Sequence, residues 1–172
     1  MSLNFKIKRL LPGFTLLLLA SFSLVADSLQ RIDVTITTHL GDEQRFSQGD
    51  AISFLLSLDK AAHIYLYYQT GEQQVLQLLP NQWQKNHYEA GLFIPFPAPE
   101  AQFNFTILPP FGEDKLWIFA SDAAAIELPT ASSINGLQGI NLSIDQIRQK
   151  IKNQSRSGFG ESSLMIMTIG GI

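Results

Sequence analysis

Short runs in which apolar and polar residues alternate recur along the chain, and this period of two is what most limits its possible folds. Between Ile32 and Thr37 every second residue is Ile or Val, and a similar alternation runs from Ile52 to Leu58. Further runs follow at 62–68 and 103–107. Successive side chains of a β-strand point to opposite faces, so the pattern is typical of strands with one buried face.

Turn residues separate these runs and favour a particular architecture. Gly49 and Gly71 lie in polar turns, and Pro80 and Pro95 end strands because proline has no N–H for the ladder. Many short strands with frequent turns are typical of a sandwich. The sequence therefore predicts an all-β fold, an Ig-like antiparallel β-sandwich. We expect strands at 32–37, 52–58, 62–68, 75–79, 92–94, 103–107, 116–120 and 164–169.

One amphipathic helix is predicted near the C-terminus, at about 143–153. Ser143 and Gln146 form a capping box, which satisfies two otherwise unpaired donors at a helix start. Three isoleucines then recur at spacings of three and four, which gives the helix one apolar face. The flanking segments 123–139 and 155–163 are expected to be loop-like and flexible.

The first 26 residues have the composition of a secretory signal peptide. Basic residues precede an apolar run from Leu10 to Val25, and Ala26 then meets an acidic residue. With cleavage after Ala26, position −3 is Leu24, where a signal peptide usually has a small residue. The alternative is a retained membrane anchor. We expect cleavage, no stable membrane insertion afterwards, a periplasmic or secreted protein, and a single β-sandwich domain at 27–172.

Charge and cysteine content exclude several classes of function. The net charge is −3, and it becomes −6 without residues 1–26, which carry three basic side chains and no acid. An acidic domain repels phosphate backbones, so we expect no nucleic-acid partner. The chain contains no cysteine, so thiolate metal sites and cysteine nucleophiles are excluded.

The sequence offers little that points to catalysis or cofactor binding. Ser57 and Lys60 match a Ser-x-x-Lys pair, but they end a predicted strand instead of opening a helix. The three histidines, His39, His63 and His87, have no further ligand at the spacing of a metal motif. No glycine-rich phosphate loop opens a helix. We therefore expect no enzyme activity, no cofactor and no metal, although folding could bring His63 and His87 together with Asp59 or Glu89.

An ordered series of short motifs runs through the chain: Phe46–Phe54, Ile64–Tyr67, Leu79–Asn81, Ala90-Gly91, Ile94-Pro95, Pro110–Gly112 and Leu116–Ser121. This series resembles the DUF4384 domain, a family named for its unknown function. The resemblance covers about Ile32 to Ser121. The family usually ends a strand with Leu-Phe-Pro-Asn; this chain has Leu78-Leu79-Pro80-Asn81, with Leu79 in place of the Phe. The resemblance implies a bacterial, often exported, Ig-like β domain that is frequently attached to other modules, and it implies no catalytic residues.

Aromatic residues gather in and near the stretch 63–95, and they define the candidate partner-binding surface. Tyr65 and Tyr67 alternate with the apolar face of their predicted strand, so they project from its opposite face. Trp83, His87 and Tyr88 lie in the polar loop that follows. Exposed aromatic side chains contribute strongly to binding surfaces. The alternative is that the second face of the strand packs beneath the helix or the proline-rich loop.

From these features we expect an exported, non-catalytic module of the bacterial cell envelope that contacts another envelope protein through the aromatic surface. A second hypothesis is that the same aromatics stack on sugar rings, as in a carbohydrate- or peptidoglycan-binding module. A third is a small hydrolase that uses scattered acids or histidines.

Overall fold

The computed structural model describes residues 29–43, 45–124, 126, 128–134 and 137–170. The predicted signal peptide at 1–26 lies outside the described residues. Within the described part of the chain, no helix is both long and apolar enough to cross a membrane.

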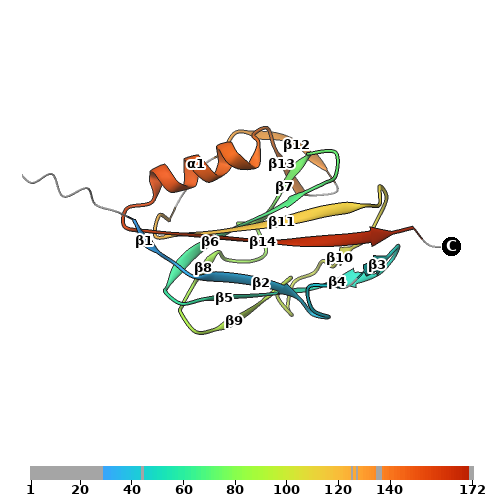
Figure 1. Ribbon diagram of the computed structural model, residues 1–172, viewed down its shortest axis with the longest axis horizontal. Coiled ribbons are helices and arrows are strands. Elements are labelled where there is room, and N and C mark those ends of the chain that lie inside the picture. The colour runs from blue at the N-terminus through green and yellow to red at the C-terminus, as the bar shows by residue number, and fades with distance from the viewer. Residues whose placement is uncertain (1–28, 44, 125, 127, 135–136, 171–172) are drawn as a thin grey trace, which may run out of the picture.

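Two β-sheets pack face to face, and a helix covers the outer face of the larger one (Figure 1). Among the described residues the larger sheet has nine strands, in the order β1-β14-β11-β6-β7-β13-β12, with β3 beside β14 and β8 beside β6. Its strands are β1 (Gln30–Arg31), β3 (Arg45–Ser47), β6 (Ala62–Gln69), β7 (Val75–Leu79), β8 (His87–Tyr88), β11 (Glu113–Ser121), β12 (Thr130–Ile134), β13 (Leu137–Ile140) and β14 (Gly158–Ile169).

The second sheet and the helix complete the layers. The smaller sheet contains β2 (Val34–Thr38), β5 (Phe54–Leu58) and β9 (Phe93–Phe96), in the order β2-β5-β9. A two-stranded pair joins β4 (Ala51–Ile52) and β10 (Phe105–Thr106). The helix α1 spans Ile144–Gln154. The predicted all-β sandwich with one helix near the C-terminus is confirmed.

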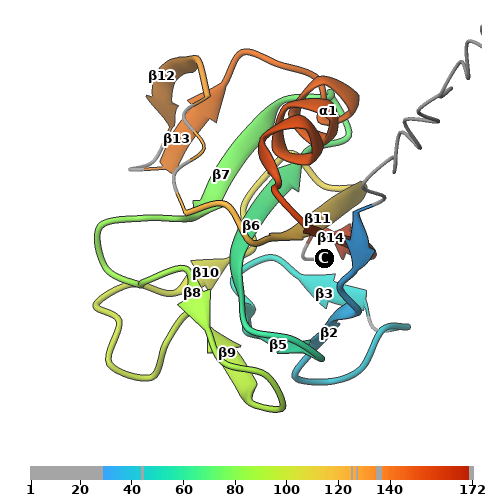
Figure 2. The ribbon, with the colours of Figure 1, turned by 90° about the vertical axis from the view of Figure 1, so that its left-hand side faces the viewer.

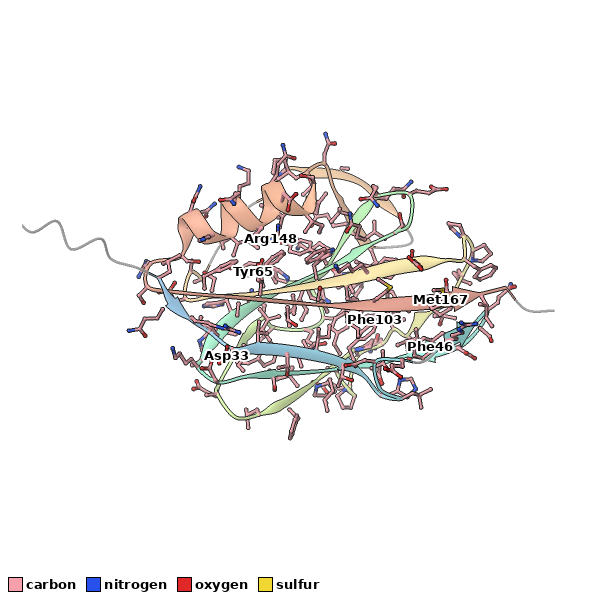
Figure 3. All side chains as sticks on the ribbon, in the orientation of Figure 1. Asp33, Phe46, Tyr65, Phe103, Arg148 and Met167 are labelled. Atoms are coloured by element: carbon pink, nitrogen blue, oxygen red, sulfur yellow. The ribbon has the colours of Figure 1, made fainter. Side chains whose placement is uncertain are left out.

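The main core lies between the two sheets. It consists of side chains that the alternation of apolar and polar residues places on one face of each strand. Ile64 of β6, Leu116 of β11 and Leu56 of β5 are fully buried there. Phe46 and Phe103, from outside the long strands, extend into the same layer (Figure 3). Each large apolar side chain buried in this way contributes roughly 1.5–3 kcal/mol to folding.

A second core lies on the opposite face of the large sheet, beneath α1. Ile147 and Ile151 of the helix are fully buried against Phe119, Tyr65 and Tyr67 from β11 and β6. The rings of Tyr67 and Phe119 lie 6.1 Å apart. The two central strands β6 and β11 are therefore buried on both faces along most of their length, as predicted for 116–120.

Polar contacts fix where α1 begins and how it lies on the sheet. Ser143 and Gln146 form the predicted capping box, with the Ser143 N–H donating to the Gln146 side chain at 2.9 Å. Further along, the Arg148 guanidinium binds Glu161 of β14 at 2.5 Å and lies 5.2 Å from the centre of the Trp117 ring. These contacts connect the exposed side of the helix to two strands.

Two segments that we predicted as loops contain strands. β12 and the first part of β13 fall within 123–139, and β14 begins at Gly158 instead of at 164. The prediction of flexibility at 155–163 was wrong because its glycines serve close packing. A Cβ atom on Gly160 would lie 2.0 Å from the Ile32 carbonyl oxygen, so glycine is required where β1 leads past β14.

Pro95 lies inside β9 instead of after it. The strand pairs only with β5 among the described elements, and Leu55 is the partner of Pro95. The Pro95 carbonyl accepts a hydrogen bond from the Gln84 side chain at 3.0 Å, so the carbonyl and the backbone nitrogen of Pro95 both point away from β5. The missing N–H therefore costs no ladder hydrogen bond, as is usual for proline in edge strands.

Asp122 joins the end of β11 to the turn between α1 and β14. Its carboxylate accepts hydrogen bonds from the backbone N–H groups of Arg156 at 2.8 Å and Ser157 at 2.7 Å, and from the Ser157 hydroxyl at 2.8 Å. Burial alone would raise the pKa of Asp122, but these hydrogen bonds favour the charged form and lower the pKa overall.

Asp122→Asn is expected to destabilise the protein at neutral pH by roughly 1–2 kcal/mol, because charge-assisted hydrogen bonds are lost at a partly exposed site. A lowered folded-state pKa gives stability that is present above the unfolded pKa and disappears as pH falls through the folded pKa. The difference between parent and variant in urea unfolding should therefore shrink below about pH 4. The exposed Glu72→Gln change serves as the control, and a pH-independent difference would contradict the assignment.

Candidate functional site

Tyr65 and Tyr67 are not part of an exposed surface. They are 1% and 0% exposed, because α1 lies across the face of β6 from which they project (Figure 3). The prediction that these two residues contact a partner is therefore wrong. The apolar side of α1 needs a surface to cover, and the tyrosine rings provide it. The alternative considered from sequence, burial beneath the helix, is what the structure shows.

The Tyr65 phenol has a structural role, whereas the Tyr67 hydroxyl is buried without a hydrogen bond to any described residue. The Tyr65 hydroxyl donates to the Ala123 carbonyl at 2.8 Å, and burial raises the pKa of Tyr65 to about 12. Burial also raises the pKa of Tyr67, with a further contribution from Tyr65. Both phenols therefore stay protonated near neutral pH, and neither is available as an acid or base.

Trp83, His87 and Tyr88 remain together, and they line a groove of about 620 Å³ beside β8 and β9. Both strands lie on the side of the molecule away from α1 (Figure 2). We call this hollow the Trp83 groove. Its apolar walls come from Trp83, Tyr88, Leu92, Phe93, Pro95 and Pro99.

Large apolar side chains at the Trp83 groove are unusually open to solvent. Phe93 is 75% exposed, Leu92 is 53% exposed and Trp83 is 44% exposed. Trp83 is supported from behind, since its ring lies 5.2 Å from that of Phe103, which packs against the main core. An aromatic ring held in this way presents a surface with little conformational entropy to lose on binding. The surface predicted from the sequence includes Trp83 but leaves out Leu92 and Phe93.

Asn81 and Gln84 hold the backbone of the groove in place. The Asn81 side-chain oxygen accepts hydrogen bonds from the Trp83 N–H at 2.8 Å and the Gln84 N–H at 2.7 Å, which forms a tight turn directly after Pro80. Gln84, only 8% exposed, donates to the Pro95 carbonyl at 3.0 Å and accepts from the Ala98 N–H at 2.9 Å. The Gln84 side chain thus makes hydrogen bonds along β9 that a neighbouring strand would otherwise make.

Three charged or titratable side chains, Lys85, His87 and Glu100, also line the groove. Among the described residues, no ion pair or hydrogen bond joins any two of them. The same part of the chain contains no group of three or more His, Cys, Asp or Glu residues that could hold a metal ion. The groove therefore offers charge at its rim without a paired acid and base.

His63 and His87 do come together through folding. They are register partners across β6 and β8, and their ring centres lie 4.6 Å apart. The pKa of His63 is lowered because burial disfavours the charged ring; its hydrogen bond with Asn86 opposes this effect and His87 adds to it. His63 is therefore mainly neutral near pH 7, while His87 is exposed at the groove.

A second hollow, of about 550 Å³, lies between β7, β13 and the start of α1. Its lining includes Gln74, Asn141, Ser143 and Gln146, and it contains neither an aromatic nor a titratable side chain. It therefore lacks the groups that commonly dominate binding or carry out catalysis. The Trp83 groove is the better candidate site.

The fold and the groove together define an all-β sandwich domain with a preformed, aromatic-lined surface and no described metal cluster. Residues 45–124 match the family model described as a domain of unknown function, DUF4384. The family predicted from sequence is thus confirmed, with a match that starts at 45 instead of about 32. No curated protein and no solved structure matches the chain.

Gln84→Ala is expected to destabilise the protein by roughly 1–3 kcal/mol, because the Ala98 N–H and the Pro95 carbonyl lose their partner in a buried position. Urea unfolding measures the effect. The neighbouring Gln82 is exposed, so Gln82→Ala should change stability by less than about 0.5 kcal/mol. Equal effects of the two substitutions would show that Gln84 does not organise the groove.

Proposed function

We propose that this protein is an exported, non-catalytic interaction module of the bacterial cell envelope, and that it binds another protein through the Trp83 groove. The observation that carries the proposal is the cluster of Trp83, Leu92 and Phe93, which leaves large apolar surfaces exposed around a preformed hollow. Exposed apolar clusters with a polar rim mark interaction sites. The signal-like sequence at 1–26 supports the location.

The groove is suited to apolar side chains of a partner segment. Strand addition along β9 is blocked, because Gln84 already binds the outward carbonyl of Pro95 and Pro95 has no N–H to offer. Recognition would therefore depend on side chains that fill the space between Trp83 and Phe93. Buried aromatic contacts of this kind supply much of the affinity in protein interfaces.

Hydrogen bonding at the groove favours a protein partner over a sugar. Sugar rings need free donors and acceptors for their hydroxyl groups in addition to an aromatic platform. Here both ends of the Gln84 amide are engaged, and the Tyr88 hydroxyl donates to the Lys85 carbonyl at 2.5 Å while it accepts from Gln84. The apolar surface remains, and much of the polar surface is already used.

The proposed absence of catalysis follows from the arrangement of the titratable groups. A general acid and base, or a nucleophile and its base, must lie within hydrogen-bond reach of a shared reacting atom. Lys85, His87 and Glu100 line one groove but form no hydrogen-bonded pair with one another among the described residues. A binding role is therefore the better account of this site.

Replacing Trp83 and Phe93 together by Ala is expected to reduce partner binding by roughly tenfold or more, since each is an exposed aromatic at the groove. A photo-crosslinker at position 92 identifies the partner in native envelopes, and calorimetry with the purified partner then measures affinity. Thermal unfolding checks that the double variant is folded.

Leu40→Ala is the matched control, because Leu40 is 56% exposed and does not line the groove. It should leave affinity unchanged. Unchanged affinity in the Trp83/Phe93 variant would contradict the proposed surface. Binding to purified peptidoglycan that is lost in the double variant would contradict the protein partner and support the carbohydrate alternative.

A further inference from the structure

The two histidines brought together by β6 and β8 form a cluster that the proposed binding role does not use. His63 and His87 face each other as register partners across antiparallel strands. Their rings lie 4.6 Å apart between centres and are tilted by 57°. Nothing in their sequence spacing, 24 positions apart, resembles a metal motif, so only the pairing of β8 with the first residues of β6 creates this arrangement.

One ring nitrogen of the pair lacks a partner. The Nδ1 atom of His63 is buried and has no hydrogen bond to any described residue. The Asn86 side chain lies close enough to His63 to oppose the lowering of its pKa by hydrogen bonding. A ring that donates its N–H on one side directs a lone pair from the opposite nitrogen. This is the usual arrangement of a histidine that binds a metal ion.

The separation of the rings matches the requirement of a shared ion. Metal–nitrogen bonds of about 2.0–2.1 Å place each ring centre roughly 3.2 Å from the ion, so ligand angles of about 90–109° put the two centres roughly 4.5–5.2 Å apart. The observed distance of 4.6 Å between ring centres lies near the lower end of this range, which corresponds to ligand angles near 90°. Such angles are preferred by tetragonal Cu²⁺ and Ni²⁺, both of which accept imidazole ligands.

We propose that His63 and His87 form a two-histidine binding site for a divalent transition-metal ion of the copper and nickel class. The site stands on the geometry of the pair and does not depend on the proposed partner binding. Because the described residues hold no group of three His, Cys, Asp or Glu ligands, water or another molecule completes the coordination. His87 is exposed at the Trp83 groove, which gives the ion a path of entry.

Nearby polar groups are consistent with only two protein ligands. Ser121 is the register partner of His63 on β11, but its hydroxyl is bonded to Ser155 at 2.7 Å and to the Ala123 N–H at 3.0 Å. It is therefore occupied. With two neutral imidazoles as ligands, the bound ion keeps its full charge.

Calorimetric titration of the full-length chain, without a histidine tag, with CuCl₂ and NiCl₂ at neutral pH tests the site. One ion should bind per chain, and the Cu²⁺ form should show electron paramagnetic resonance couplings from two imidazole nitrogens. His87→Asn should weaken binding by roughly tenfold or more, because one of two protein ligands is lost. His87 is exposed, so this variant is expected to fold normally.

His39→Asn is the matched control, since His39 is remote in register from the pair and bonds instead with the Ser53 backbone. It should bind the ion as the parent does. His63→Asn should weaken binding like His87→Asn. Equal affinity of the parent and His87→Asn, coupling to a single nitrogen, or a loss of binding in His39→Asn would overturn the proposal.

Discussion

Burial of the central strands on both faces is the constraint on which the rest of the structure depends. β6 and β11 carry apolar side chains toward the smaller sheet and aromatic side chains toward α1. A sheet with two apolar faces must be covered twice, and here one cover is a sheet and the other is a short helix. Because α1 has only 11 residues, its contacts with Trp117 and Glu161 help to fix its position on the sheet.

The same constraint decides where a binding surface can be. Once α1 covers Tyr65 and Tyr67, the most exposed aromatic side chains among the described residues are Trp83, in the connection before β8, and Phe93, in β9. There the edge of β9 is protected by a side chain, Gln84, and not by a strand. Edge protection by Gln84 and Pro95 discourages unspecific strand pairing, while Trp83 and Phe93 stay available for side-chain recognition.

The sequence predicted features that depend on neighbours along the chain and failed where distant segments meet. Alternation identified the inner face of β6, and the capping box located α1 to within a residue. Alternation cannot tell what covers the second face, so Tyr65 and Tyr67 were misplaced. Likewise, Gly160 looked flexible because its contact, the Ile32 carbonyl, lies far away in sequence. The pairing of His63 with His87 required the register of β8 on β6.

The path of the chain between β7 and β8 explains why both candidate sites lie together. β7 pairs with β6 from Leu66 to Gln69, and β8 pairs with Ala62 and His63, on the edge of β6 that does not face β11. The chain therefore leaves this edge at Pro80 and returns to it at His87. The excursion between these points is short, and Asn81 folds it into a turn that directs Trp83 outward. Both ends of this excursion are anchored on β6. The pairing of β7 and β8 with β6 therefore sets the position of Trp83 near one end and of His87 at the other. A change that loosens β8 from β6 would consequently disturb the groove and the histidine pair together.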